Sequence, residues 1–522
     1  MKKKTFLCLI LTAAIFLSAF STFRNEQGMD GANVVSSVTP EDTADCGAIW
    51  ANKFSTKGFS CNSIPIMGAN GIYIVNSNTL YELSYANGQV LRKTTLKEKM
   101  DSVCNMLLEE HFLYIPLANG TMECVDITSM TSLWQSKSFG GQSLSTTFYQ
   151  DGYLYAGTTN FLSNGTTTGL FYCLNAKDGS TVWTYEDTDH PGGYYWSGAI
   201  VYEDALFFTG DNGILVSHSL TEPVVYDTAV LTTANIRAGL TYHKGTDALY
   251  TVAKDGTLFQ IQCGNQKITE VSSGKIMNGA NFVTCTSTPT IYNNRLYVGC
   301  MADQYGYVCV MDALTLKPIY QVKGFQNAEV KSSPLVSTRG SSTGEVTVYF
   351  SMNALPGGLY AFKDTEGKTS ASLHTLYIPQ AKQYCLSSIT ADDKGRLYYS
   401  NDSGTLFCVT LAKDIPATST PTVTSAPAAK KSVSKPKKPY SVKVKKSKKK
   451  YKVTWKKKSK KYQTIISYRY GKGKWKKKTI KKNTAATIKK GKKRLQIRLR
   501  CKIKKQSKWI YSSYTKTFSF CP

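Results

Sequence analysis

The stretch GLFYCLNAKDGSTVWTY, residues 169–185, contains the pattern that decides the fold. Apolar residues alternate with others up to Asn175, a Lys-Asp-Gly turn follows, and a second short run leads to Trp183. Alternation with a period of two, bounded by Gly, Asn and Asp, is typical of paired β-strands. Cys173 in the first run and Trp183 in the second could belong either to a chemical site or to the packing of a sheet.

Related strands recur eight times along the chain. Each copy has a short apolar strand that carries one aromatic residue, at Tyr73, Tyr114, Tyr155, Phe208, Tyr250, Tyr297, Tyr349 and Tyr398. Most copies continue with a second strand, a turn and a third strand. One such sheet cannot bury both of its faces, whereas eight sheets arranged around an axis bury their faces against one another. The sequence therefore predicts an all-β fold with an eight-bladed β-propeller.

The eighth copy lacks its last strand. It ends with TLFCVTLAKD, residues 405–414, which runs into a segment rich in Pro, Thr and Ser. The missing strand is predicted near the other end of the chain, in DCGAIWANKF, residues 45–54, where Trp50 is placed like Trp134 and Trp183. We expect this N-terminal strand to complete blade eight, because closure removes an otherwise open sheet edge.

The repeats resemble a known family. Residues 153–183 and 287–320 are similar to the pyrroloquinoline-quinone (PQQ) type propeller repeat, with its small-small-Pro, Gly-x-Leu-Tyr-x-Gly and Leu-Asn-Ala-x-x-Gly-x-x-x-Trp segments. The resemblance covers residues 45–411 and implies a propeller. Its superfamily includes quinone-dependent dehydrogenases, proteins without a cofactor such as the propeller lipoprotein of outer-membrane protein assembly, and secreted binding proteins.

The resemblance gives limited support to an enzyme. Dehydrogenases of this superfamily need a disulfide between adjacent cysteines, a Trp that stacks on the quinone, and Glu, Asn and Asp ligands for Ca²⁺ beside a catalytic Asp. The chain has no Cys-Cys pair, and its only Trp within a blade outside the packing position is Trp196. Asp211, Asp392 and Asp393 are interpreted as turn residues. We therefore assign no catalytic, cofactor-binding or metal-binding residue and predict no cofactor. The alternative is a quinoprotein-like dehydrogenase or another enzyme with its site in the propeller funnel.

The propeller is instead expected to bind an unknown protein or glycan through its loops. The longer connections at residues 159–168, 186–196 and 338–345 are the candidate contact segments.

The cysteines form two groups. Aligned second strands place in one column the residues Glu82, Cys124, Cys173, Ser217, Gln260, Cys309, Ala361 and Cys408. A small buried thiol suits closely packed sheets, so these cysteines and Trp183 are interpreted as packing residues. Cys61, Cys104 and Cys385 precede the inner strands of neighbouring blades and form a possible disulfide or thiol cluster, with inert packing as the alternative. Without a CxxC pair or ligand spacing among the five His, a metal site is not favoured.

Residues 1–21 have the features of a secretory signal peptide: a basic start, an apolar run and small residues near its end. No later segment approaches eighteen apolar residues. We therefore predict a secreted, extracellular or cell-wall-associated protein without a transmembrane span.

The net charge of +30 is distributed unevenly between two parts of the chain. Residues 430–522 contain 37 Lys and Arg and no Asp or Glu, while residues 22–429 have a net charge of about −10. Residues 412–439 are predicted to be a linker rich in Pro, Thr, Ser and Lys. Alternating apolar strands return in residues 440–522, where YKVTW, RLQIRLRCKI and KWIYSSYTKTF resemble strands of a fibronectin type III domain. That resemblance implies a small β-sandwich with Trp455 in its core. Cys501 and Cys521 could form a disulfide there.

Self-repulsion of this size favours a polyanionic partner. Outside a cell the first candidate is an anionic wall polymer such as teichoic acid, followed by a membrane surface and then by nucleic acid, with salt-dependent binding in each case. The candidate polyanion-binding residues are Lys448, Lys449, Lys450, Lys456, Lys457, Lys458, Lys476, Lys477, Lys478, Lys492, Lys493 and Arg494. The sequence thus predicts a propeller that recognises a ligand and a Lys-rich module that holds it to an anionic wall.

Overall fold

The computed structural model describes residues 33–101, 105–415, 423–425, 436–447, 449–471, 473–505 and 508–520. The proposed signal peptide, Cys104, Lys448 and Cys521 lie outside these ranges. The chain divides into two compact units, residues 1–427 and residues 428–522. Within the described residues, no helix is long and apolar enough to cross a membrane.

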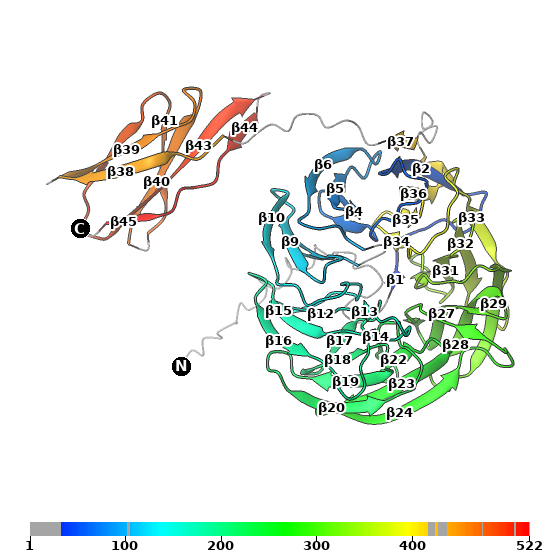
Figure 1. Ribbon diagram of the computed structural model, residues 1–522. Helices are drawn as coiled ribbons and strands as arrows, with labels where there is room; N and C mark the ends of the chain where they lie inside the picture. The colour runs from blue at the N-terminus through cyan, green and yellow to red at the C-terminus, as the bar shows by residue number, and fades with distance from the viewer. Residues whose placement is uncertain are drawn as a thin grey trace, which may run out of the picture. The chain divides into compact units, whose positions relative to one another are not determined.

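Eight sheets of the first unit surround a central axis, as Figure 1 shows, and confirm the predicted propeller. The strands of each blade are given from the inside of the ring to the outside. Blade one contains β3 (Ile66–Gly68), β4 (Gly71–Asn76), β5 (Thr79–Leu83) and β6 (Val90–Thr95), and blade two contains β7 (Leu107–Glu109), β8 (Phe112–Pro116), β9 (Met122–Asp126) and β10 (Thr131–Gln135). Blade three contains β11 (Phe148–Gln150), β12 (Tyr153–Gly157), β15 (Phe171–Asn175) and β16 (Thr181–Tyr185), and blade four contains β17 (Ala199–Tyr202), β18 (Ala205–Thr209), β19 (Ile214–His218) and β20 (Val225–Val230).

Blades five to eight follow in the same order. Blade five contains β21 (Thr241–His243), β22 (Ala248–Val252), β23 (Thr257–Gly264) and β24 (Lys267–Lys275), and blade six contains β25 (Val283–Thr284) and β26 (Thr290–Tyr292), β27 (Arg295–Ala302), β28 (Tyr305–Asp312) and β29 (Pro318–Gln326). Blade seven contains β30 (Leu335–Ser337), β31 (Val346–Ser351), β32 (Leu359–Asp364) and β33 (His374–Tyr377). Blade eight contains β34 (Thr390–Ala391), β35 (Leu397–Asn401), β36 (Thr405–Leu411) and β2 (Cys46–Lys53). The short elements β1 (Val34–Val35), β37 (Val423–Ser425) and η1 (Ala412–Asp414) complete this unit, with the ribbon β13 (Asn160–Phe161) and β14 (Thr167–Thr168).

The closure prediction is confirmed. Strand β2 pairs antiparallel with β36, and Trp50 lies opposite Cys408. Two segments more than 350 positions apart in the sequence therefore share blade eight, and β2 covers the edge of β36 that would otherwise be open.

The small-small-Pro segments explain how the blades are joined around the axis. The backbone N–H of Gly239 donates to Thr288 Oγ1 at 2.9 Å, that of Thr288 donates to Ser333 Oγ at 3.1 Å, and that of Ser333 donates to Ser388 Oγ at 3.0 Å. Each hydroxyl thus accepts a hydrogen bond from the preceding blade. Small polar residues are needed here because the inner strands converge and every buried N–H needs a partner.

The aromatic column faces the next blade and forms the cores between sheets. In three blades a cross-strand set of Tyr, Cys and Trp lies in register: Tyr114, Cys124 and Trp134; Tyr155, Cys173 and Trp183; and Tyr398, Cys408 and Trp50. All three cysteines are buried. Cys173 and Trp183 are therefore packing residues between blades three and four.

The predicted column needs two corrections. In blade four the residue that faces the next blade is Phe207, paired with Ser217, and Phe208 faces the preceding blade. In blade six Tyr297 pairs with Val310, so Cys309 lies on the opposite face of the sheet. Because side chains alternate along a strand, a one-residue error in alignment reverses the face.

A segment near the N-terminus lines the inside of the ring, which the sequence did not predict. Strand β1 pairs in parallel with β30, the inner strand of blade seven, and lies near the centre in Figure 1. Asn33 Nδ2 donates to the carbonyl oxygen of Pro334 at 3.0 Å, and farther along the segment Glu41 forms ion pairs with Arg339 and Lys363. These contacts attach the segment to blade seven.

The second unit is formed by two sheets. One contains β38 (Tyr440–Lys446), β39 (Lys450–Lys456) and β42 (Ala485–Lys489); the other contains β41 (Lys476–Ile480), β40 (Gln463–Tyr470), β43 (Leu495–Lys505) and β44 (Lys508–Tyr511), with β45 (Phe518–Phe520) also on β43. Trp455 lies between them, is 3% exposed, and donates from Nε1 to Thr464 Oγ1 at 2.9 Å. The expected core position of Trp455 is confirmed.

Candidate functional site

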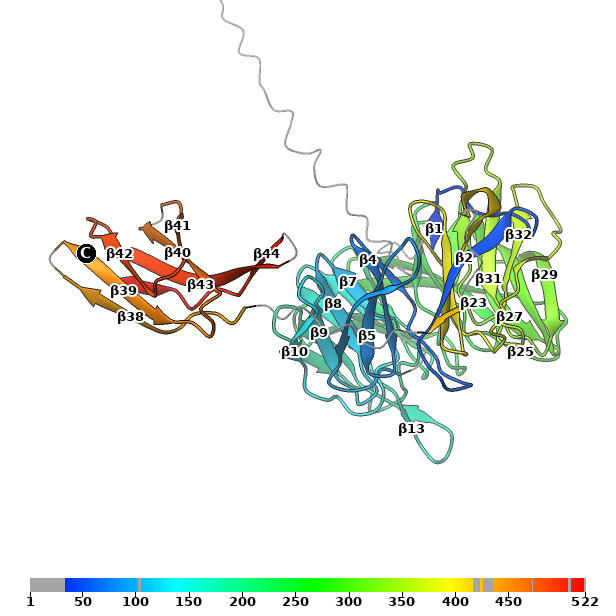
Figure 2. The same cartoon turned by 90° about the horizontal axis from the view of Figure 1, so that it is seen from above.

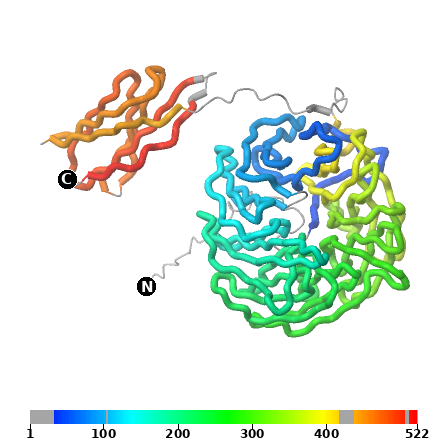
Figure 3. Tube along the Cα trace, in the orientation of Figure 1, coloured from blue at the N-terminus to red at the C-terminus, as the bar shows by residue number. Residues whose placement is uncertain are grey.

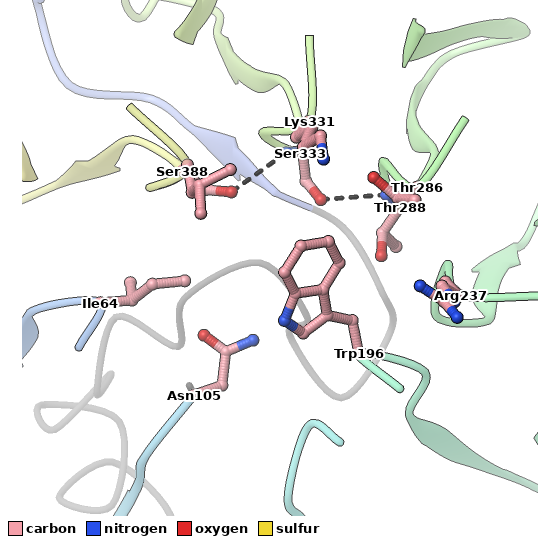
Figure 4. A pocket seen from close by; sticks show the side chains of 10 residues that line it. Ile64, Asn105, Trp196, Arg237, Thr286, Thr288, Lys331, Ser333 and Ser388 are labelled. Atoms are coloured by element: carbon pink, nitrogen blue, oxygen red, sulfur yellow. Dashed lines mark hydrogen bonds between the residues drawn. The ribbon is translucent and has the colours of Figure 1, made fainter. Parts of the chain in front are cut away.

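A hollow on the propeller axis collects side chains from seven of the eight blades (Figure 4). Each lining residue precedes the inner strand of its blade, so the repeat places all of them at the same end of the axis. The residues are Ile64, Asn105, Trp196, Arg237, Thr286, Thr288, Lys331, Ser333, Leu386 and Ser388. Two are cations, four carry hydroxyl groups, and none is acidic.

Both cations are held by carboxylates that lie behind the lining. Arg237 binds Asp211 through Nε at 2.9 Å and Nη2 at 3.0 Å, and Asp211 is 6% exposed. Lys331 Nζ lies 3.4 Å from the carboxylate of Glu329. The pKa of Glu329 is raised above its usual value, because the effect of burial exceeds the lowering by Lys331. The interpretation of Asp211 as a simple turn residue was therefore incomplete, because this carboxylate positions Arg237 at the hollow.

Aromatic rings extend the hollow outward. The guanidinium of Arg237 lies 4.4 Å from the ring centroid of Tyr195, and Tyr195 contacts both Trp196 at 4.7 Å and Phe161 at 5.5 Å between centroids. Lys331 Nζ lies 5.8 Å from the Trp196 ring. We call these five residues, Phe161, Tyr195, Trp196, Arg237 and Lys331, the axial cluster. The sequence singled out Trp196 among them, but a pattern of strands could not place Arg237 and Lys331 beside it.

Two of the three predicted contact segments meet at this cluster. The ribbon β13–β14 within residues 159–168 projects from one face of the propeller (Figure 2). Gly193 N donates to Thr167 Oγ1 at 3.0 Å, which joins the ribbon to segment 186–196. Phe161 and Leu162 on the ribbon are 55% and 44% exposed. Segment 338–345 connects the first two strands of blade seven and therefore lies at the opposite end of the axis.

The hollow offers mainly hydrogen-bond donors, among them two cations that are each paired with a carboxylate. Trp196 Nε1 and Thr286 Oγ1 are buried without a hydrogen-bond partner in the described structure. An anionic group would satisfy both and would meet two cations. Backbone φ of Trp196 is +61°, a conformation that a bulky residue adopts only when its surroundings hold it there.

The lining does not fit the Ca²⁺ ion of the quinone-dependent dehydrogenases. Ca²⁺ binds six to eight oxygen ligands that include carboxylates, whereas the hollow has no acidic lining residue and the nearby Asp211 and Glu329 are paired with cations. Among the residues that the structure describes, no group of three or more His, Cys, Asp and Glu is arranged to hold a metal ion.

Comparisons with known proteins agree with this fold. Residues 32–216 match the family described as outer membrane protein assembly factor BamB. BamB from Moraxella catarrhalis is 12% identical over 70% of this chain and 99% of its own, with a TM-score of 0.50. Quinohemoprotein alcohol dehydrogenase ADHIIG from Pseudomonas putida HK5 is 10% identical over 80% of this chain and 83% of its own, with a TM-score of 0.57.

A third similar structure is a europium-containing methanol dehydrogenase, 10% identical over 75% of this chain and 98% of its own, with a TM-score of 0.55. No curated protein matches the sequence. At these identities the likenesses to solved structures establish a β-propeller fold, which is common to proteins named for catalysis and proteins named for assembly.

The cysteine predictions concern the same end of the axis. The thiol of Cys61 contacts Asp402, and that of Cys385 lies 3.3 Å from the carbonyl oxygen of Ser400. The two cysteines thus approach one segment of blade eight, while Cys104 lies outside the described residues. In the second unit Cys501 is buried, and its suggested partner Cys521 is also outside them. The disulfide or thiol cluster of Cys61, Cys104 and Cys385 stays a prediction, and so does the disulfide between Cys501 and Cys521.

The candidate polyanion-binding residues of the second unit do not form one patch. Lys449, Lys450, Lys492, Lys493 and Arg494 are exposed at one end of the sandwich, and Lys476, Lys477 and Lys478 are exposed on the edge strand β41. At the other end Lys456 and Lys458 are exposed, while Lys457 Nζ donates to the carbonyl oxygens of Tyr462 at 2.6 Å and Lys482 at 3.2 Å. Lys457 is therefore already engaged within the unit.

Proposed function

We propose that this is a secreted, cell-wall-associated, non-catalytic binding or scaffold protein. The propeller would recognise a ligand, and the Lys-rich second unit, a fibronectin type III-like module, would anchor it to an anionic polymer such as teichoic acid. The observation that carries the anchoring role is the charge of residues 430–522, where 37 basic residues have no acidic counterpart. The three-stranded and five-stranded sheets around Trp455 support the fibronectin type III resemblance.

The axial cluster is the proposed recognition site of the propeller. Cations, unpartnered donors, the exposed Phe161 ring and the half-buried Tyr195 and Trp196 rings together suit an acidic loop or chain end of a partner protein, with an acidic glycan as the alternative ligand. The name of the matched family, an assembly factor, supports a role in binding proteins. Preorganisation by Asp211 and Tyr195 means that Arg237 loses little freedom when it binds.

Titration of the full chain with an acidic peptide, followed through tryptophan fluorescence, tests the recognition site. Lys331→Gln should weaken binding by about tenfold, the loss expected for one charge-assisted contact. Lys317→Gln is the matched control, because Lys317 is exposed in the turn between β28 and β29 at the opposite end of the axis. Equal binding by both variants would contradict the axial site.

The quinoprotein alternative has one supporting observation, the likeness of fold to two dehydrogenases. It predicts that PQQ together with Ca²⁺ raises the melting temperature of the full chain, since a ligand that binds only the folded state stabilises it. The poor fit of the axial lining to Ca²⁺ predicts no shift. A shift that disappears when Ca²⁺ is chelated would favour the enzyme over the binding protein.

A further inference from the structure

One face of the second unit carries a row of alternating arginine and aromatic side chains. From one end to the other, the guanidinium-to-ring distances are 4.7 Å for Arg469 and Trp475, 4.3 Å for Trp475 and Arg498, 4.3 Å for Arg498 and Tyr514, 4.7 Å for Tyr514 and Arg500, and 4.3 Å for Arg500 and Tyr511. We call these six residues the arginine ladder. Each contact lies within the range of a cation–π interaction.

Strand geometry explains why the ladder forms. Arg498 and Arg500 are two residues apart on β43 and therefore point to the same face, while Leu499 between them is buried in the core. The neighbouring strand β40 places Ser467 opposite Arg498, and the hydroxyl groups of Ser467 and Tyr514 are 3.2 Å apart. Arg469 Nε donates to Gln496 Oε1 at 2.6 Å. The ladder is thus held by both backbone register and side-chain contacts.

The arginines are positioned but not neutralised by acidic side chains of the unit. Residues 430–522 contain no Asp or Glu, so the unit has no carboxylate side chain to pair with them. The Nε atoms of Arg498 and Arg500 are buried and have no hydrogen-bond partner among the described residues. A guanidinium whose plane is fixed by rings presents parallel N–H donors at its edge, which match two oxygens of a phosphate group.

The rings restrict the chemistry of the polymer. The Trp475 ring contacts both Arg469 and Arg498, and the Tyr514 ring contacts both Arg498 and Arg500. Single-stranded nucleic acids are held largely by bases that stack on aromatic faces, and each of these two rings already contacts two guanidinium groups. We infer that the arginine ladder binds the phosphodiester groups of a base-free wall polymer of the teichoic acid type, an inference that rests on the proposed anchoring function.

The ladder and the lysines have different roles in this account. The exposed lysines occur at both ends and one edge of the unit and supply a positive field that attracts any polyanion. The ladder supplies directed hydrogen bonds, which lysine, as a compact point charge, supplies less well. Replacing arginine by lysine should therefore separate the two contributions, because the charge remains and the planar donors are lost.

The test measures binding of the full chain to purified poly(glycerol phosphate) teichoic acid over a salt series. The double variant Arg498→Lys/Arg500→Lys should bind about tenfold more weakly at every salt concentration, with an unchanged slope of log K against log salt. The control Lys492→Gln/Lys493→Gln removes two exposed charges away from the ladder and should reduce that slope by about 1.4. Melting curves of both variants confirm that the second unit remains folded.

A second readout covers the case in which the arginine variant unfolds. The Nε–H NMR signals of Arg498 and Arg500 in the unaltered chain should shift on addition of the teichoic acid. Unshifted signals, or a lysine-for-arginine variant that binds like the unaltered chain, would overturn the ladder and leave a diffuse anchor. Failure of the unaltered chain to bind teichoic acid would instead overturn the proposed function. Tighter binding to single-stranded DNA of equal phosphate number would overturn the base-free ligand.

Discussion

Trp50 lies opposite Cys408 across the strand pair that closes the propeller, and its Nε1 donates to the carbonyl oxygen of Tyr85 in blade one at 3.2 Å. Trp183 has the equivalent position in blade three, where its Nε1 donates to Leu220 of blade four at 3.0 Å. One tryptophan therefore joins the two ends of the propeller, whereas the other joins blades that are consecutive in the chain.

This difference predicts unequal effects of equal truncations. Trp50→Ala and Trp183→Ala should each cost about 3–5 kcal/mol through lost burial, but only Trp50→Ala should weaken the contact that closes the ring. Denaturant unfolding of Trp50→Ala should then show a broadened, less cooperative transition, because the ring opens before the blades unfold. Identical transition slopes for the two variants would contradict the role assigned to β2.

Asp364 is a second structural hub with a measurable cost. It is fully buried and accepts hydrogen bonds from Arg295 at 2.6 and 3.0 Å, from the Tyr297 hydroxyl at 2.7 Å and from the Tyr320 hydroxyl at 2.6 Å. Asp364→Asn should lower the free energy of unfolding by about 3–5 kcal/mol, since it leaves Arg295 without its countercharge.

The control for Asp364 is the exposed ion pair between Asp255 and Lys275, whose side chains are 45% and 52% exposed. Asp255→Asn should cost less than about 1 kcal/mol. Comparable losses for the two variants in denaturant unfolding would show that burial does not govern these carboxylates.

The buried carboxyl group of Asp402 should make the stability of the folded chain depend on pH. Burial raises its pKa from 3.8 to about 6, against a smaller lowering by the hydrogen bond from Cys61. Between these values the folded chain holds a proton that the unfolded chain has lost, so stability should fall as pH rises from 4 to 6. The free energy of unfolding should fall by up to about 3 kcal/mol because of this group, since each unit of pKa difference between the folded and unfolded chain corresponds to about 1.36 kcal/mol.

Asp402→Asn should lack this contribution. The measurement is the free energy of unfolding of both proteins between pH 4 and pH 7, with the difference between them plotted against pH. A constant difference across the range would show that Asp402 titrates normally in the folded chain.

The buried cysteines should be chemically inert in the folded protein. Burial raises the pKa of Cys124 and of Cys408 to about 12, and the carboxylates nearby add to the shift for Cys124. Because the thiolate is the reactive form, neither should react with a thiol reagent at pH 8 until the chain unfolds. Mass spectrometry of peptides labelled before and after denaturation measures this directly, and labelling of Cys124 or Cys408 in the folded chain would contradict the packing role.

The fold was largely predictable because its information is local and periodic. Alternation, turn residues and the positions of Tyr155 and Trp183 define one blade, and repetition defines the ring. The predictions were wrong where the spacing between strands differs from one repeat to the next. The sheet face on which Cys309 lies, for example, depends on the register between β27 and β28, which only the paired strands determine.

The candidate sites were less predictable because they depend on contacts between distant segments. Arg237 and Lys331 meet Trp196 only because blades four, five and seven converge on the axis. The arginine ladder depends on Tyr511 and Tyr514 lying over β43. A count of lysines identified the charge of the second unit, but it could not distinguish dispersed charges from an ordered row.

Cosedimentation with purified Gram-positive cell walls measures whether the basic unit anchors the protein. The full chain is compared with a chain that ends at Pro427, using walls before and after removal of teichoic acid, over a salt series. We predict that only the full chain pellets, and that it is released by salt and by loss of teichoic acid. Equal pelleting of both chains, or a full chain that stays in solution with untreated walls, would contradict the anchoring role of the basic unit.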